Sequence, residues 1–272
     1  MHILAGVKCM RTKVAVCSDV GKHRGVNQDN FFINGFVNEN HRTRIIRSFF
    51  ASKKEQVICV CDGMGGEMHG EIASLIAVKK MRSYSDKHGR FIDDFEQHAK
   101  TYIDRANKAI CDYIDTHDRE TMGSTLALLC ISIKNRFAMA ANVGDSKIFL
   151  FRAGILTKLS IDHNEAQRLV DLEIISEEEA RTHKDKSKLT QHLGIPPEEM
   201  IIEPSISDSV LLNKGDMFLI CSDGLTDMLN YAEITNVLSQ RSSVKARCKA
   251  LVDKANSNGG VDNITVVICE VV

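Results

Sequence analysis

Short runs of Val, Ile, Leu and Phe, bounded by Gly, Asn and Asp, recur along the chain. Runs of this length and composition predict β-strands. Most of them are joined by turns too short to hold a crossover helix, so we expect largely antiparallel sheets. Asn135-Arg136 separates two runs in the way a tight hairpin would. The predicted strands are residues 13–18, 31–34, 57–61, 125–133, 137–142, 147–151, 217–221 and 264–271.

Three segments show helical spacing instead. Between residues 91 and 116 apolar positions recur every three or four residues, which predicts an amphipathic helix with one buried face. A second helix should follow Gly70 and a third should cover residues 244–255. Because the strands occur in runs and the helices are segregated from them, the pattern indicates an α+β layered fold. The side chains expected to face the core are Ile72, Leu75, Ile76 and Met81 in the second helix, and Cys248, Leu251 and Val252 in the third.

Two polar stretches interrupt this pattern. Residues 38–56 form a basic insertion, which we interpret as an extended or mobile hairpin tip with solvated charges. The alternative is a docking surface for an acidic partner, whose binding should weaken when residues 40–54 are deleted. Residues 162–194 predict a projecting lobe, with Ser176 and Glu179 spaced as a capping box. The basic residues of these two stretches are Arg42, Arg44, Arg47, Lys53 and Lys54, and Arg181, Lys184, Lys186 and Lys188.

Composition narrows the class of protein. The 272 residues are 43% hydrophobic and 26% charged, as in ordinary globular proteins, and no linker or repeat divides them, so we expect one domain over residues 1–272. The net charge of -1 argues against binding nucleic acid or an anionic membrane through bulk charge. No apolar run reaches the roughly 20 residues of a membrane helix, and the N-terminus does not follow the order of a secretory signal. The nine cysteines lack metal-type spacing, so we interpret them as reduced core residues of a cytoplasmic protein.

Five aspartates share one local context: each lies at the end of an apolar run and next to a residue that permits a tight turn. Any one of them alone is typical of a turn. Strand ends on adjacent strands converge, however, and several carboxylates brought together repel one another unless divalent cations neutralise them. A set of oxygen ligands without a cysteine or histidine pattern favours Mg²⁺ or Mn²⁺ over zinc. The five are Asp29, Asp62, Asp145, Asp223 and Asp262.

The motifs around these aspartates follow one another in a specific order along nearly the whole chain. They are Ser18-Asp-Val-Gly21, Asp62-Gly-Met-Gly-Gly66, Gly123-Ser-Thr125, Asn142-Val-Gly-Asp-Ser146, Ser222-Asp-Gly-Leu225 and Asp262-Asn-Ile-Thr265. In residue types and order they resemble the motifs of the metal-dependent serine/threonine protein phosphatases of the PPM or protein phosphatase 2C type, in the compact bacterial form. The resemblance implies a four-layer α-β-β-α sandwich of two antiparallel sheets flanked by helices, with residues 162–194 as a flap beside the active site.

The same resemblance implies a centre of two Mn²⁺ or Mg²⁺ ions. Asp62 would bridge the two ions, with the carbonyl of Gly63 as a further ligand, and Asp223 and Asp262 would complete the first metal. A glycine after the bridging aspartate makes physical sense, because its backbone must turn for carbonyl and carboxylate to reach one ion. Asp145, together with Asp223, resembles the site of a third, weaker metal.

Two further residues take roles from the resemblance. Arg24 matches the arginine that holds the substrate phosphate, a task suited to its planar fork of donors. Asp29 resembles the acidic residue that orients the attacking water. Two cations lower the pKa of a bridging water and neutralise the phosphoryl oxygens, so no covalent phosphoenzyme is required. The cysteines near these aspartates do not sit in a Cys-x5-Arg loop, so a cysteine nucleophile finds no support.

The chain departs from the family pattern at two positions. Gln28 stands where many relatives carry Glu, which predicts a weaker or water-mediated contact to the second metal. Met64 stands where eukaryotic members often have a histidine general acid, so the leaving group must take its proton from water or from another residue. We interpret His69, close by in sequence, as a solvated or capping histidine.

We therefore expect a cytoplasmic, monomeric hydrolase of phosphoserine and phosphothreonine on proteins, opposing a partner serine/threonine kinase. The first alternative is a catalytically weak or inactive pseudophosphatase that binds phosphoproteins, which the complete set of matched carboxylates disfavours. The second is a metal-dependent phosphoesterase acting on nucleotides or small molecules. Comparing turnover of phosphopeptide and nucleotide would separate it from the first expectation.

Overall fold

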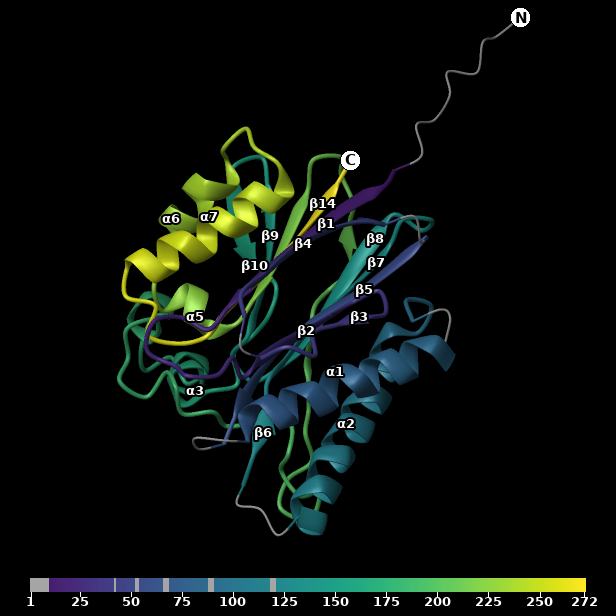
Figure 1. Cartoon of the computed structure of the whole chain (residues 1–272), viewed down its shortest axis with the longest axis vertical. Helices are drawn as coiled ribbons and strands as arrows, with labels where there is room; N and C mark the ends of the chain where they lie inside the picture. The colour runs from purple at the N-terminus through teal and green to yellow at the C-terminus, as the bar shows by residue number, and fades with distance from the viewer. Residues whose placement is uncertain (1–9, 42, 52–53, 66–68, 88–90, 118–120) are drawn as a thin grey trace, which may run out of the picture.

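Two antiparallel sheets lie face to face, with helices on both outer sides (Figure 1). The computed structural model describes residues 10–41, 43–51, 54–65, 69–87, 91–117 and 121–272. Within these ranges the arrangement is the expected four-layer α-β-β-α sandwich. No helix in the described ranges has both the length and the apolar character needed to cross a bilayer.

The six-stranded sheet is antiparallel in every pairing between its described strands. Its strands are β1 (Thr12–Asp19), β4 (Ile45–Ala51), β9 (Lys147–Arg152), β10 (Ile155–Lys158), β13 (Met217–Cys221) and β14 (Ile264–Val271). They follow the order β10-β9-β13-β14-β1-β4. The central pair, β1 and β14, is in register from Thr12 opposite Val271 to Asp19 opposite Ile264. The ends of β1 and β13 and the start of β14 therefore meet at one edge of the sandwich.

The second sheet has eight strands in the described residues and is built around β5. Its strands are β2 (Asp29–Ile33), β3 (Phe36–Val37), β5 (Glu55–Met64), β6 (Gly123–Ser124), β7 (Leu126–Ser132), β8 (Phe137–Val143), β11 (Ser205–Ile206) and β12 (Val210–Leu211). The main path is β11-β8-β7-β5-β2-β3, with β6 beside β5 and β12 beside β8. Ser132 pairs with Phe137, and Arg136 has a φ of 61°, so the expected tight hairpin at Asn135-Arg136 is confirmed.

Helices cover the outer face of each sheet. The helices are α1 (Gly70–Lys87), α2 (Phe95–His117), α3 (Glu165–Asp171), α4 (Glu177–Ala180), α5 (Asp223–Thr226), α6 (Tyr231–Leu238) and α7 (Val244–Ser257). α1 and α2 pack on the eight-stranded sheet, whereas α5, α6 and α7 pack on the six-stranded sheet (Figure 1). The capping box expected at Ser176 and Glu179 is present at the start of α4.

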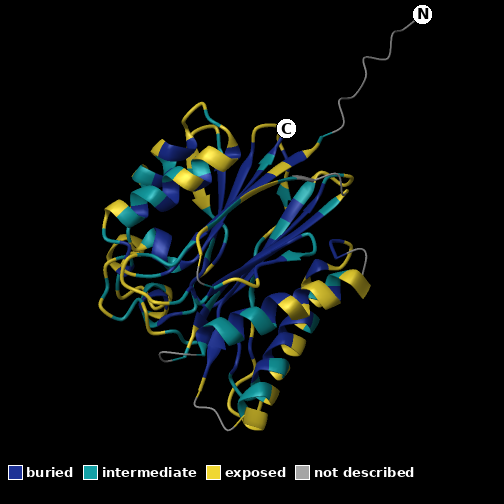
Figure 2. Cartoon of the chain, in the orientation of Figure 1, coloured by how far each residue is buried: buried dark blue, intermediate teal, exposed yellow. Residues whose placement is uncertain are grey.

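Three apolar layers hold these elements together, and Figure 2 shows that burial follows the sheets and the helix faces turned toward them. Successive side chains of a strand point to opposite faces of the sheet, so neighbouring residues belong to different apolar layers. Along β5, Cys59 and Cys61 face α1 and α2, while Ile58 and Val60 face the other sheet. The described cysteines are free, and all except the half-buried Cys111 are buried, as expected for core residues.

The predicted eight strands and three long helices are all present, but one helix face differs. In α1 the fully buried positions include Ala73, Ala77 and Val78 beside Met81, while the expected Ile72, Leu75 and Ile76 are only partly buried at the margin of the core. Small residues occupy the contact because α1 approaches β5 closely. A Cβ at Gly63 would collide with the carbonyl oxygen of Gly70, the first residue of α1.

The prediction that residues 38–56 form a hairpin tip is wrong for residues 45–51. These form β4, the edge strand that pairs with β1 from Thr12 opposite Ala51 to Ser18 opposite Ile45. β4 belongs to the six-stranded sheet, whereas β3, which precedes it in the sequence, and β5, which follows it, belong to the other sheet. The insertion therefore crosses from one sheet to the other and back (Figure 1).

The basic residues of this insertion are largely engaged in contacts. Arg44 bonds Asp253 of α7 at 2.7 Å and lies 3.4 Å from Asp19. The Arg47 guanidinium lies 4.8 Å from the centre of the Phe36 ring. These contacts fix β4 to both sheets and explain why a charged segment is ordered as a strand, while Arg42 and Lys53 lie outside the described residues.

Candidate metal centre

The predicted aspartates gather at one edge of the sandwich. Asp29 opens β2 and is paired in register with Asp62 near the end of β5, so both side chains lie on the same face of the sheet. Asp223 is the first residue of α5 and is separated from the end of β13 by Ser222, and Asp262 precedes β14. The hydroxyl of Ser222 donates to Asp29 Oδ2 at 2.7 Å and so connects the two sheets at this point.

The backbone around Asp62 is held from both sides. The Asp62 N–H donates to Thr125 Oγ1 at 2.9 Å, and that hydroxyl lies 2.6 Å from Ser146 Oγ. The next amide, of Gly63, donates to the Gln28 carbonyl at 3.1 Å. Because any Cβ at position 63 would meet the Gly70 carbonyl, only glycine permits this approach of strand and helix. These contacts therefore hold the main chain in place at Asp62 and Gly63.

The electrostatics of this cluster disfavour bare carboxylates. Burial raises the pKa of Asp62 well above its usual range, and repulsion from Asp29 and Asp223 adds to the effect. Burial also raises the pKa of Asp29 to about 7, although the Ser222 hydroxyl opposes the shift. The pKa of Asp223 is raised by burial and by the nearby Asp227 and Asp262. Each ionised carboxylate is therefore costly here unless a cation neutralises it.

Two buried oxygens show that these residues fit a hard divalent cation. Asp29 Oδ1 and Asp223 Oδ1 are buried and have no hydrogen-bond partner among the described residues. Unpartnered buried carboxylate oxygens are unusual in folded proteins and need a specific explanation. Oxygen ligands in this number are what Mg²⁺ and Mn²⁺ prefer. The chemistry of the donor set thus agrees with the expected metals.

The carboxylates are close but not drawn into a compact ligand set. In the part of the chain that the structure describes, no group of three or more His, Cys, Asp or Glu side chains is assembled at metal-binding spacing. Asp262 is instead paired with Arg24, whose Nη2 donates to Asp262 Oδ2 at 2.7 Å. Asp262 Oδ1 accepts the Asn263 N–H at 2.7 Å, so both oxygens of this carboxylate have hydrogen-bond partners.

Asp145 lies beside a second group of charges that the sequence did not indicate. Burial raises the pKa of Asp145 to about 8, with repulsion from Asp223 added. Nearby, Lys147 Nζ lies 3.1 Å from Asp162 Oδ2. Burial alone would lower the pKa of Lys147, but Asp162, Asp145 and Asp223 outweigh it and raise that pKa. A cavity of about 50 Å³ between the flap and the sheet is lined by these residues.

The basic side chains of the flap mostly hold it in place. Lys186 Nζ lies 2.7 Å from Oδ1 of Asp227, the residue that caps the C-terminal end of α5. The Arg181 guanidinium lies 4.0 Å from the centre of the Tyr231 ring. Lys188 pairs with Asp185 inside the lobe itself. These contacts give three of the four predicted basic residues a structural task. No signal in the sequence could have shown them, because their partners lie in distant segments or depend on the fold of the lobe.

The two departures from the family pattern also have structural positions. The Gln28 carbonyl accepts from Gly63 and from Ser74 Oγ, and its own N–H donates to Asn263 Oδ1 at 2.7 Å. Gln28 thus joins β5, α1 and the start of β14. Met64 is 38% exposed at the end of β5. The His69 carbonyl accepts the N–H groups of the first turn of α1, so His69 stands at the start of that helix.

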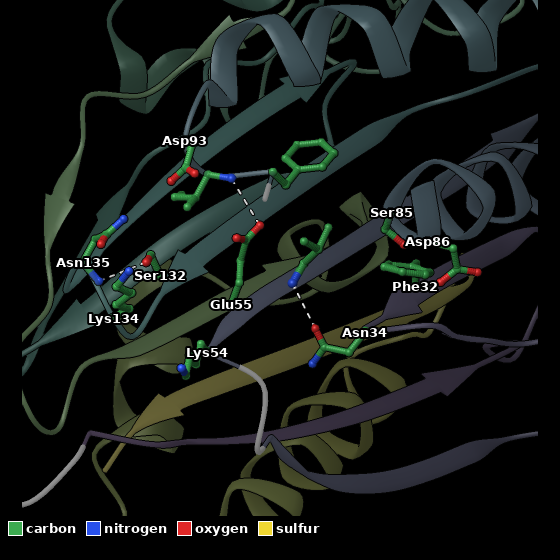
Figure 3. A pocket seen from close by; sticks show the side chains of 13 residues that line it. Phe32, Asn34, Lys54, Glu55, Ser85, Asp86, Asp93, Ser132, Lys134 and Asn135 are labelled. Atoms are coloured by element: carbon green, nitrogen blue, oxygen red, sulfur yellow. Dashed lines mark hydrogen bonds between the residues drawn. The ribbon is translucent and has the colours of Figure 1, made fainter. Parts of the chain in front are cut away.

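A separate cavity of about 470 Å³ lies at the other end of β5 and contains none of the predicted site residues (Figure 3). Glu55 lies in its centre and accepts the Ile92 N–H at 3.2 Å. The Val57 N–H donates to Asn34 Oδ1 at 3.0 Å on the same wall. Its central polar groups are therefore satisfied within the chain, and the converging aspartates remain the candidate site.

The fold and this site together define a class of protein. The family model described as "Protein phosphatase 2C" matches residues 32–264, and the chain belongs to that family of serine/threonine protein phosphatases. Among curated relatives, protein phosphatase PhpP of Streptococcus pneumoniae is 33% identical over 257 residues, or 94% of this chain and 96% of that protein. Serine/threonine phosphatase stp of Listeria monocytogenes is 30% identical over 256 residues, 93% of each chain.

Solved structures support the same assignment. The serine/threonine phosphatase of S. agalactiae has a TM-score of 0.80 at 31% identity, covering 95% of this chain and 99% of that one. The catalytic domain of the serine/threonine protein phosphatase PstP, solved with two manganese ions, has a TM-score of 0.73 at 27% identity, covering 97% and 99%. The expected family, fold class and enzyme class are thus confirmed.

Proposed function

We propose that the protein hydrolyses phosphoserine and phosphothreonine esters on proteins by direct attack of a metal-activated water. One observation carries the proposal: buried carboxylates from both sheets converge with unpartnered oxygens at the point where Arg24 also reaches. Bound Mn²⁺ or Mg²⁺ ions, two per site, would supply an activated water and neutralise the phosphoryl oxygens. The manganese-containing PstP domain supports a metal of this kind.

The residues divide into ligands and orienting groups. Asp62, the Gly63 carbonyl, Asp223 and Asp262 are the proposed ligands, and Asp145 with Asp223 is the proposed third, weaker site. Asp29 is fully buried, and its Oδ2 is fixed by the Ser222 hydroxyl, so its Oδ1 is the proposed acceptor that orients the attacking water.

Arg24 has a role that follows from its exposure. Its side chain is 50% exposed, and among the described residues its hydrogen-bond partner is Asp262, so it can exchange that carboxylate for an incoming phosphate. A guanidinium holds two phosphate oxygens at once with little loss of freedom. We therefore infer that Arg24 binds the substrate phosphate and that Asp262 would serve as a ligand when an ion is bound.

The partners we propose are phosphorylated proteins and a cognate serine/threonine kinase, with the chain acting as a monomeric cytoplasmic protein and residues 1–272 forming one catalytic domain. Deleting residues 40–54 is no longer a clean test of docking, because it removes β4 from the six-stranded sheet. Lys54, whose side chain lines the cavity at the far end of β5, is a better position for such a test.

The substrate class can be tested directly. Turnover of a phosphothreonine peptide and of a nucleotide would be measured with Mn²⁺ and with chelator. We expect metal-dependent turnover of the peptide well above that of the nucleotide. Faster nucleotide turnover would replace the proposal with a small-molecule phosphoesterase, and peptide binding without turnover would indicate a pseudophosphatase.

A further inference from the structure

Release of serine or threonine from a phosphate ester requires a proton. The departing alkoxide is strongly basic, and general acid catalysis of this step commonly contributes 10²- to 10⁴-fold. Histidine is the side chain that ordinarily titrates between pH 5 and pH 8 and so suits this task. Position 64, at the end of β5, carries a methionine that cannot donate a proton. The proton must therefore come from water or from a residue on another element near Asp62.

His192 lies on the same face of the sheet as Asp62. An antiparallel bridge joins Ser124 to Leu193, which sets His192 opposite Thr125. Thr125 in turn donates its N–H to the Asp62 carbonyl at 2.8 Å. Two strand spacings of about 4.8 Å each therefore separate the backbones of Asp62 and His192.

Gly123 lies beside the His192 imidazole. Gly123 is paired with Met64, so substituents at the two positions project from the same face, which is also the face of Asp62 two residues earlier. A Cβ on Gly123 would lie 2.5 Å from His192 Nδ1. The imidazole thus lies over Gly123, beside Met64, in space that only a glycine leaves open.

The orientation of the imidazole is fixed at one nitrogen. His192 Nδ1 lies 3.0 Å from the Leu193 carbonyl oxygen, and because a carbonyl only accepts, Nδ1 carries the proton in this contact. Nε2 has no hydrogen-bond partner among the described residues, and the side chain is half-buried. The described residues that the register sets beside the ring are Gly123 and its partner Met64, neither of which titrates, and the nearest titratable group on the same face of β5 is Asp62, two residues before Met64.

We propose that His192 donates the proton to the serine or threonine leaving group, an inference that rests on the proposed phosphatase function. As water attacks phosphorus, the bond between phosphorus and the ester oxygen breaks and its electron pair stays on that oxygen. The oxygen takes the proton from Nε2 of the imidazolium. The neutral imidazole then regains a proton from solvent.

The test compares two substrates that differ in their need for a proton. A phosphoserine peptide releases a basic alkoxide, whereas an aryl phosphate with an electron-withdrawing group releases a stable anion without protonation. In Mn²⁺ buffer, H192Q should lower kcat on the peptide by about 10²-fold and leave kcat on the aryl phosphate nearly unchanged. The aryl phosphate rate also shows that the variant is folded.

Two further measurements separate a proton donor from a structural residue. On the peptide, the wild-type kcat should fall as the pH rises through the titration of the acid, and H192Q should lose this alkaline limb. G123A, which displaces the ring, should show the same substrate-dependent loss, while H117Q at the far end of α2 should match the wild type.

The outcomes are distinct. Equal loss on both substrates, or no loss on either, would overturn the role of His192 while leaving the phosphatase function intact. A wild-type protein that hydrolyses neither substrate would overturn the proposed function, and the inference with it.

Discussion

The two ends of strand β5 each carry a partly buried carboxylate, and they differ in what surrounds it. At its start, burial raises the pKa of Glu55, whose oxygen accepts the Ile92 N–H and lies 3.5 Å from the Cys130 thiol (Figure 3). At its other end, burial raises the pKa of Asp62, and the next causes are further carboxylates. Burial is common to both ends. The neighbouring residues determine whether the carboxylate finds hydrogen-bond donors within the chain, as Glu55 does, or lies among other carboxylates that a cation could neutralise, as Asp62 does.

Activity should separate the two ends most strongly. D62A or D223A removes a proposed metal ligand, so kcat/KM on a phosphothreonine peptide should fall by about 10³-fold or more while the fold persists. E55Q, at the other end of the same strand, should retain wild-type activity. Rates and far-UV circular dichroism would be measured together, and wild-type rates from D62A would refute the assignment.

Removing the metal should lower the Tm only of proteins that keep the aspartates at the Asp62 end of β5. An ion that binds only the folded state at 100 times its Kd stabilises it by about 2.7 kcal/mol. Mn²⁺ should therefore raise the Tm of the wild type and of E55Q, but much less that of D62N. Thermal unfolding with Mn²⁺ and with chelator would measure this, and an equal rise in all three proteins would contradict the metal site.

The dependence on pH should follow the raised pKa values of about 7 for Asp29 and about 8 for Asp145. An acid whose pKa is raised by folding binds more protons in the folded state, so its stabilising contribution is lost as the pH rises through the folded pKa. In chelator, the Tm should fall between about pH 5 and about pH 8. D145N should flatten part of this fall, and a Tm that rises over this range would be inconsistent with the cluster.

The smallest effect is expected for Glu55 itself. Because burial disfavours its charge, E55Q keeps a hydrogen-bond acceptor for Ile92 without the ionised form. The free energy of unfolding in urea should change by no more than about 1 kcal/mol. A much larger loss would show that the charge of Glu55 is essential to that end of the strand.

The sequence predicted the elements whose signal is local. Apolar runs marked strands such as β13 and β14, and each aspartate of the cluster stood beside a turn residue at a strand end. β4 was missed because the arginines in and before it resemble those of a solvated segment, although Arg44 and Arg47 are held by Asp253 and Phe36. The contacts of Arg24, Lys147 and His192 join distant segments, so only the folded chain reveals them.

The most direct test of the account is the number of Mn²⁺ ions bound per chain, measured by equilibrium titration of the wild type, D62A and E55Q. We expect about two tightly bound ions for the wild type and for E55Q, with tight binding lost in D62A. If D62A binds the same number of ions with the same affinity, the converging aspartates are not the metal centre.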